Sequence, residues 1–251
     1  MAHSAIPRLG VVVPPENPTA EPEFNSLVGD RMHVFATRFP VTPGMALREM
    51  LETYNAVLPR TLDSFGEMRL DAALVACSAS HYLLGPDGDR RFCAELGERA
   101  GYPVQSSTQA ILAACEALDL TRLVLVSPYE PWLTDASRTF WEQAGLTVVR
   151  TVPVPAGDHF NPYEVTTETI LERVRGHDVP DDAALLFTGT GMYTLAALDE
   201  LARQDDRVLL TSNLAGAWWA LRTVDCRPVE DDHALLRRLA RRTEALAADA
   251  A

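Results

Sequence analysis

Short apolar runs alternate with longer polar and amphipathic stretches along this chain. Residues 72–76 form one continuous apolar run, which is typical of a strand buried on both faces of a parallel sheet. Near the end of the chain, Leu235, Leu236, Leu239 and Leu246 recur at helical spacing and predict an amphipathic helix, whose arginines we expect to face solvent. Strands that alternate with helices predict an α/β protein.

The pattern of strands and turns occurs twice in the same order. Residues 8–15 resemble residues 122–129, and three further segments have counterparts in the second half: 32–41 with 146–154, 70–77 with 181–188, and 102–108 with 208–213. Matched elements in one order predict a doubled α/β unit, and the seam between two such units is a natural place for a site.

The doubling predicts the architecture. We expect two similar Rossmann-like lobes, each with about four parallel strands flanked by helices, related by a pseudo-two-fold axis. Lobe one would comprise residues 1–110 plus 219–251 and lobe two residues 111–218, with the active site in the cleft between them. The helices after Thr108 and Asn213 would carry the chain across and back, and the arginine-rich last helix would rejoin lobe one.

Composition narrows the class of protein. The 251 residues are 47% hydrophobic, which is ample for one large core or two small ones. A formal net charge of −13 argues against a nucleic-acid partner, because such binding depends on clustered Lys and Arg. No secretion signal and no apolar stretch of about 18 residues is present, so we expect a cytoplasmic protein without a membrane partner. The sequence leaves the oligomeric state open, a homo-oligomer included.

Four cysteines occur without CxxC or His-spaced motifs, which predicts neither a disulfide framework nor a metal site. Cys93 and Cys115 fall in helical patterns and are expected to be buried, whereas Cys226 is expected to be a surface or packing residue. Cys77 directly follows the buried run 72–76, at the strand edge where open parallel sheets bind ligands.

A helix is predicted to begin just after Cys77, and its amino terminus would lower the pKa of the thiol and attract a carboxylate. A buried cysteine without chemistry is the alternative. His81 could act as the base for this thiol, although a solvated or core-edge histidine is the more frequent explanation. Similarly, Arg38 could clamp a carboxylate or form a structural ion pair.

Small and hydroxylated turns follow most of the predicted strands. Taken one at a time, each is an ordinary helix N-cap. Together they would line a cleft with neutral hydrogen-bond donors and almost no fixed cations, which suits a small carboxylate or a transient enediolate. The turns lie at residues 14–19, 106–108, 127–129, 188–191 and 211–213.

At these residues the chain resembles the aspartate/glutamate racemase superfamily, and within it the branch of maleate cis-trans isomerase and arylmalonate decarboxylase. The residues that carry the resemblance are Asn17, Glu21, Cys77, Gly85-Pro86, Tyr129, Asn161, Ser212-Asn213 and Ala217-Trp218. The resemblance implies a catalytic Cys77. With the turns above, it implies substrate binding by Pro15, Asn17, Ser78, Tyr129, Asn161, Thr188, Gly189 and Thr190.

One departure from the family pattern concerns the second cysteine. Counting back five residues from Thr194, where the family has that cysteine, reaches Gly189. Racemisation by two bases needs an acid and a base on opposite faces of the carbon, so glycine disfavours it. A hydroxyl of Thr188 or Thr190 would be a poor substitute for a thiol, because its proton is held more tightly.

Three hypotheses remain for what the protein does with a small dicarboxylate. In an isomerase, the Cys77 thiolate would add to a cis double bond, allow rotation and leave again. In a decarboxylase, Cys77 would protonate an enediolate, from the face opposite to that used by the familiar enzyme. The third is a carboxylate-binding protein without turnover. We favour the isomerase. Gly189 and Gly191 alone make no dinucleotide motif, and no Walker sequence occurs, so no cofactor is expected.

Overall fold

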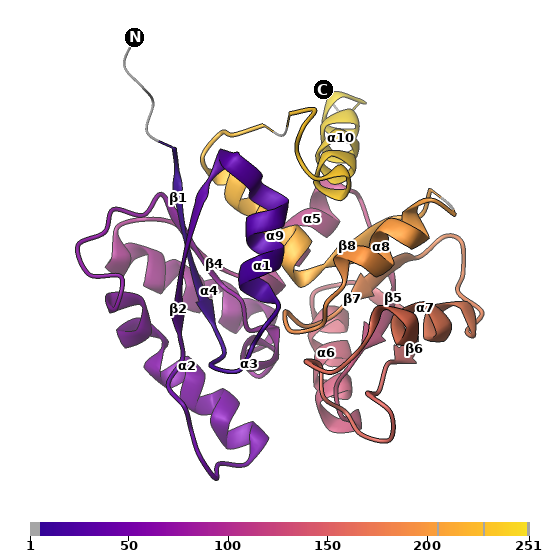
Figure 1. Cartoon of the computed structure of the whole chain (residues 1–251), viewed down its shortest axis with the longest axis horizontal. Helices are drawn as coiled ribbons and strands as arrows, with labels where there is room; N and C mark the ends of the chain where they lie inside the picture. The colour runs from indigo at the N-terminus through magenta and orange to yellow at the C-terminus, as the bar shows by residue number, and fades with distance from the viewer. Residues whose placement is uncertain (1–5, 205, 228, 250–251) are drawn as a thin grey trace.

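A computed structural model, which describes residues 6–204, 206–227 and 229–249, contains two four-stranded parallel sheets (Figure 1). Their strand orders, β2-β1-β3-β4 and β6-β5-β7-β8, are the same when counted from the start of each half, which confirms the predicted doubling. The strands are β1 (Arg8–Val13), β2 (His33–Arg38), β3 (Ala72–Val75), β4 (Val104–Ser106), β5 (Arg122–Ser127), β6 (Thr147–Pro153), β7 (Ala184–Phe187) and β8 (Leu209–Thr211).

Helices connect these strands and cover the sheets. The first half contains α1 (Ala20–Val28), the 3-10 turn η1 (Gly29–Arg31), α2 (Leu47–Asp63), α3 (Ser78–Tyr82), α4 (Gly85–Ala100) and α5 (Ser107–Ala117). The second contains α6 (Pro131–Gln143), α7 (Thr167–Arg175), α8 (Leu195–Ala202), α9 (Ser212–Thr223) and α10 (Ala234–Asp249). Strands β3 and β7 are buried along their whole length, as continuous apolar runs predict for central parallel strands. No helix in the described ranges is long and apolar enough to span a bilayer.

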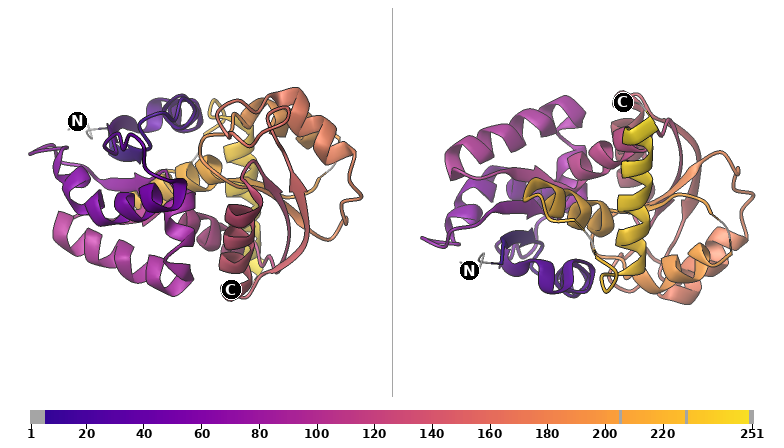
Figure 2. Two further views of the ribbon diagram at one scale, coloured as in Figure 1. Left: turned by 90° about the horizontal axis from the view of Figure 1, so that it is seen from below. Right: turned by 90° about the horizontal axis from the view of Figure 1, so that it is seen from above.

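Helix α9 follows a strand of the second sheet but packs on the first, against α1, β3 and α5 (Figure 2). Gly216 permits this contact, because a Cβ there would lie only 2.6 Å from Cδ2 of Leu74. Helix α10 contacts α9 and α5, while Arg238 and Arg242 on it form ion pairs with Asp206. The residue boundaries expected for the two lobes stay a prediction.

Two expectations for α10 are wrong in detail. Arg238 and Arg242 are engaged with the segment after α8, and their side chains are only 26% and 23% exposed, so this part of the basic face is not solvated. Leu246 is exposed, unlike Leu235 and Leu236, because the helix extends beyond the surface that buries its first turns.

A buried carboxylate joins the two halves. Glu23 on α1 accepts hydrogen bonds from the backbone N–H groups of Thr194 (2.7 Å) and Leu195 (3.2 Å) at the start of α8. Its other oxygen accepts from the side-chain amide of Asn213 on α9 (2.8 Å). Burial raises the pKa of Glu23, although these donors oppose the shift. The carboxylate therefore connects three helices.

Candidate active site

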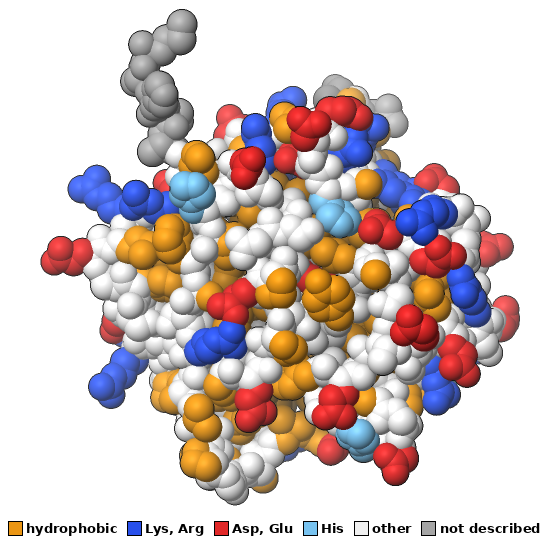
Figure 3. Space-filling model, in the orientation of Figure 1, with side chains coloured by type: hydrophobic (Ala, Val, Ile, Leu, Met, Phe, Trp, Pro, Cys, Tyr) orange, Lys and Arg blue, Asp and Glu red, His pale blue; other side chains and the backbone are white. Residues whose placement is uncertain are grey.

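A cavity of about 430 Å³ opens where the carboxyl ends of strands from both sheets meet. This is the position that parallel sheets favour for ligands. Both halves line it, through residues 14–17, 41–44, 77–79, 128–130, 160–163 and 190–191 together with side chains of α2 and α6. Apolar side chains gather toward the lower edge of the face shown in Figure 3. Val41, before α2, and Leu47, the first residue of α2, line the cavity, and both are exposed.

Cys77 lies on the cavity wall, two residues after β3 and directly before α3. Only 4% of the residue is exposed. Burial raises the pKa of the thiol, and hydrogen bonding with Ser80 only partly offsets that effect. The prediction of a lowered thiol pKa is therefore wrong, since α3 is a single short turn and the sulfur is held away from water.

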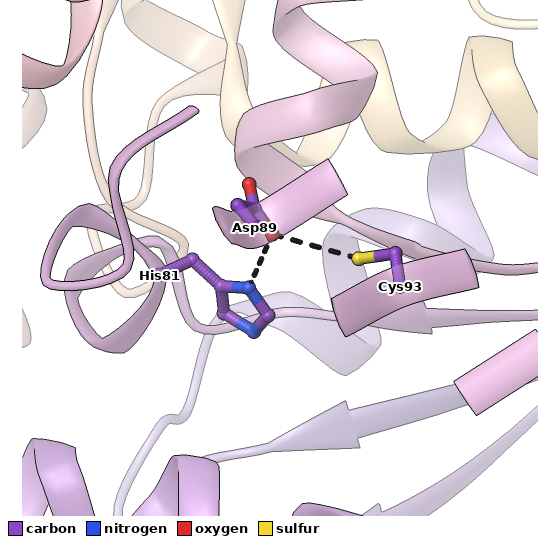
Figure 4. A group of neighbouring side chains, drawn as sticks. All are labelled: His81, Asp89 and Cys93. Atoms are coloured by element: carbon purple, nitrogen blue, oxygen red, sulfur yellow. Dashed lines mark hydrogen bonds and ion pairs between the residues drawn. The ribbon is translucent and has the colours of Figure 1, made fainter. Parts of the chain in front are cut away.

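His81 is not among the residues that line the cavity with Cys77. Its Nδ1 lies 2.6 Å from Oδ1 of Asp89 on α4, and the Cys93 thiol donates to the same carboxylate at 3.5 Å (Figure 4). All three residues are buried. The imidazole thus links α3 to α4. His81 therefore fits the role of a core histidine better than the role of a base for Cys77.

The carboxylate of Asp89 is surrounded by donors. Its Oδ2 accepts from the hydroxyls of Ser106 (2.9 Å) and Thr108 (2.6 Å) and from Nε2 of Gln109 (3.1 Å). Burial works against ionisation, but the neighbouring His81 and the hydroxyls outweigh it and hold the pKa of Asp89 below its ordinary value. His81, Asp89 and Cys93 bring possible metal-ligating atoms within 4.8 Å of one another. These atoms already bond to each other, which favours a structural network.

Gly189 lies two residues after β7, the position that corresponds to Cys77 after β3. Its φ of +93° favours glycine, and a Cβ there would lie 2.5 Å from the hydroxyl oxygen of Tyr129. Tyr129 lines the cavity, whereas Gly189 and Thr188 do not. The phenol thus occupies the space that a side chain at position 189 would need. Tyr163 similarly packs where a Cβ of Gly191 would project.

Several of the expected donors are engaged within the protein. The amide of Asn17 donates to Oγ1 of Thr190 (3.0 Å), and that hydroxyl donates to the carbonyl oxygen of Ala76 (2.7 Å). The hydroxyl of Thr188 is hydrogen-bonded to that of Tyr82. Asn17 and Thr190 line the cavity, but their polar groups connect the two halves.

Three further predicted residues also reach the cavity wall: Pro15, Ser78 and Asn161. The hydroxyl of Ser78 lies 2.8 Å from that of Ser107 and 3.0 Å from that of Ser212, the first residues of α5 and α9. The amide nitrogen of Asn161 donates to Glu164 at 2.7 Å. The side chains of Ser78 and Asn161 are therefore already hydrogen-bonded to the protein.

Arg38 forms an ion pair with Glu21 rather than lining the cavity. It also donates to the carbonyl oxygen of Pro15 at 3.0 Å and to that of Asn17 at 3.2 Å. The guanidinium therefore holds the loop after β1 in place. Of the two interpretations given for Arg38, the structural ion pair fits and the carboxylate clamp does not.

Two tyrosines on the cavity wall escaped the sequence analysis. Tyr54 on α2 stacks on Phe39 with ring centroids 4.4 Å apart, and burial followed by the nearby Cys77 raises its pKa to about 12. Burial likewise raises the pKa of Tyr163. Tyr163 lies two residues after Asn161 and could have been found from that spacing, whereas no motif marks Tyr54.

The described residues that line the cavity include no Lys, Arg or His, and Glu16 and Glu130 are the acids among them. The side-chain donors of this lining are therefore neutral hydroxyl and amide groups, which include the hydroxyls of Tyr54, Tyr129 and Tyr163. Such donors can stabilise developing negative charge on a substrate without a cation.

Comparison with known proteins gives one consistent result. The sequence profile of the arylmalonate decarboxylase family matches residues 9–236. Maleate isomerase of Nocardia farcinica is 27% identical over 233 residues, which cover 88% of this chain and 91% of that protein. Arylmalonate decarboxylase of Bordetella bronchiseptica is 24% identical over 231 residues, covering 88% and 92%.

Solved structures agree with the sequence comparison. A Nocardia farcinica maleate cis-trans isomerase with a covalently bound succinylcysteine intermediate is similar with a TM-score of 0.80 and 26% identity, covering 92% of this chain and 98% of that one. Unliganded arylmalonate decarboxylase is similar with a TM-score of 0.73 and 18% identity, covering 94% and 99%. The second likeness supports the fold alone.

Proposed function

Because this chain belongs to the arylmalonate decarboxylase family, we propose that it is a cofactor-independent, maleate isomerase-like enzyme acting on a small dicarboxylate. The proposal rests mainly on the position of Cys77, which lines the cavity between the two parallel sheets. The similar Nocardia farcinica isomerase, with its succinylcysteine, supports covalent chemistry at a cysteine. Location in the cytoplasm and assembly into a homo-oligomer remain predictions.

In the proposed reaction, the Cys77 thiolate adds to one alkene carbon of a cis-enedioic acid. The former double bond then rotates as a single bond, and departure of the thiolate gives the trans product. Addition moves negative charge toward the distal carboxylate, where the hydroxyl of Tyr129 and backbone amides of the wall would stabilise it. Pro15, Asn17, Ser78, Asn161 and Thr190 would shape the binding site, whereas Thr188 and Gly189 lie behind its wall.

Decarboxylation of a substituted malonate is the second candidate, and two observations favour it. Burial raises the pKa of Cys77, so the protonated thiol is available to donate to an enediolate. The apolar side chains of Val41, Leu47 and Met50 line one part of the cavity and would accommodate a hydrocarbon substituent. Catalytically silent carboxylate binding is the third candidate.

Proton NMR in deuterated water distinguishes the candidates. The protein is incubated with maleate, with phenylmalonate and with neither. Fumarate selects the isomerase, a singly deuterated monoacid selects the decarboxylase, and ligand broadening without product selects the binding protein. Cys77→Ser should abolish either turnover. Cys226 is not among the residues that line the cavity, so Cys226→Ser is the matched control and should remain active. Full activity of Cys77→Ser would refute the role of that thiol.

A further inference from the structure

The two halves place Cys77 and Gly189 at corresponding positions. Each lies two residues beyond the second central strand of its sheet, β3 and β7 respectively. In a doubled unit with its cavity at the seam, the two positions are equivalent by topology, but only Cys77 lines the cavity. Only the first of them carries a chemically active side chain.

A phenol from another segment fills the vacant position. The loop after β5 brings Tyr129 in front of Gly189, so that the tyrosine oxygen lies 2.5 Å from the point where a Cβ of residue 189 would be. Tyr129 is on the cavity lining and Gly189 is not. The backbone of Tyr129 is fixed from both sides, since its N–H donates to the Ser127 hydroxyl (3.4 Å) and its carbonyl accepts from the Thr134 hydroxyl (3.0 Å).

We propose that the Tyr129 hydroxyl is the proton donor and acceptor on the face of the substrate opposite Cys77, in place of a side chain at position 189. The inference rests on the proposed isomerase function and deepens it. Neighbouring hydroxyls are less suitable. The Thr190 hydroxyl already donates a hydrogen bond to the carbonyl oxygen of Ala76. The Thr188 hydroxyl is hydrogen-bonded to that of Tyr82, and Thr188 does not line the cavity.

The cycle starts from the Cys77 thiolate, whose proton has been lost to solvent, and it needs no further reactant. As the Cys77 sulfur bonds to the first alkene carbon, the π electrons take the proton of the Tyr129 hydroxyl onto the second carbon, which leaves a phenolate. Rotation follows about the resulting single bond. The phenolate then removes a proton from the second carbon, the C–S electron pair returns to sulfur, and the double bond forms again. Burial raises the pKa of Tyr129, so the phenol is protonated before each cycle.

This geometry has a consequence for isotopes. Because the phenol stays on the face opposite the sulfur, removal of the same hydrogen that it delivered regenerates the cis acid. The trans acid forms only when rotation brings the carbon's original hydrogen to the phenolate. In deuterated water, therefore, each fumarate molecule formed in a first turnover keeps one deuterium. A mechanism in which the enediolate is never protonated gives unlabelled fumarate.

The test is mass spectrometry of fumarate formed from maleate in deuterated water at low conversion. The expected result is singly deuterated fumarate from the natural protein. Unlabelled fumarate would overturn this inference and leave the isomerase function intact, whereas no fumarate at all would overturn both.

Two variants assign the proton transfer to one tyrosine. Tyr129→Phe should lower kcat by about a hundredfold or more and yield unlabelled residual fumarate, with a smaller change in KM. Tyr163→Phe is the matched control, because Tyr163 also lines the cavity and its ring packs against Gly191; fumarate from this variant should keep the label whatever its rate. Labelled fumarate from folded Tyr129→Phe would contradict the assignment. Circular dichroism establishes that both variants fold.

Discussion

The side-chain amide of Asn17 donates a 3.0 Å hydrogen bond to the hydroxyl of Thr190, across the boundary between the two halves of the chain. Thr190 in turn donates to the carbonyl oxygen of Ala76, the residue before Cys77. The loops after β1 and β7 and the end of β3 are thereby joined through two side chains. The position of the thiol depends on contacts from both halves.

Replacing Asn17 tests this connection. Its Oδ1 also accepts from the backbone N–H groups of Thr19 (2.9 Å) and Ala20 (3.0 Å), so Asn17→Ala leaves buried donors without partners. We expect a loss of about 1–3 kcal/mol in the free energy of unfolding, measured with urea. Asn25→Ala is the control, because its exposed amide donates only to the carbonyl of Glu21. Equal losses in both variants would contradict the role of Asn17.

The pH dependence of turnover follows from the raised pKa of Cys77. Isomerisation requires the thiolate, so its rate should still be rising above pH 9, the ordinary pKa of the group. Decarboxylation requires the protonated thiol. Because the thiol pKa is raised, ionisation of Cys77 should not lower the decarboxylation rate over the same range. Initial rates between pH 6 and about 10 provide the measurement. An isomerisation rate that reaches its plateau below neutral pH would show that substrate binding lowers the thiol pKa.

Asp89→Asn should destabilise the protein strongly at neutral pH. The carboxylate is buried, and its folded-state pKa is lowered, so its contribution is fully present above the unfolded value near 3.8 and is lost as pH falls through the folded value. We expect a loss of about 3–5 kcal/mol at pH 7 that narrows below about pH 4. The exposed pair of Asp87 with Arg90 supplies the control, and Asp87→Asn should change stability by less than about 1 kcal/mol. A loss of stability in Asp89→Asn that does not change with pH would argue against an ionised Asp89.

Gly189→Ala should lower the free energy of unfolding more than the matched replacement Gly145→Ala. Gly189 and Gly145 have similar φ angles, +93° and +89°, but only Gly189 has atoms near the point where its Cβ would lie. Backbone strain in each variant should amount to about 1–3 kcal/mol, and crowding against Tyr129 should add to it at position 189. Urea denaturation gives the difference, and kcat should fall only for Gly189→Ala. Equal stability losses would show that Tyr129 can move aside without cost.

Much of the fold could be predicted from the sequence because buried parallel strands and their turns are local signals. The run 72–76 lies in and beside β3, and Cys77 follows at the sheet edge and on the cavity wall, as expected. Burial and partners depend on distant packing and could not be predicted. For this reason the thiol pKa was predicted in the wrong direction, and Tyr54 on α2, beside the cavity, was missed.

The buried Glu23 has a consequence for how a ligand reaches the cavity, because it links α1 to the start of α8 and to α9. Its carboxyl group accepts hydrogen bonds from the start of α8 and from α9, so separating these helices from α1 would leave a buried polar group and several N–H groups without partners. We therefore expect small molecules to enter and leave the cavity without separation of these helices.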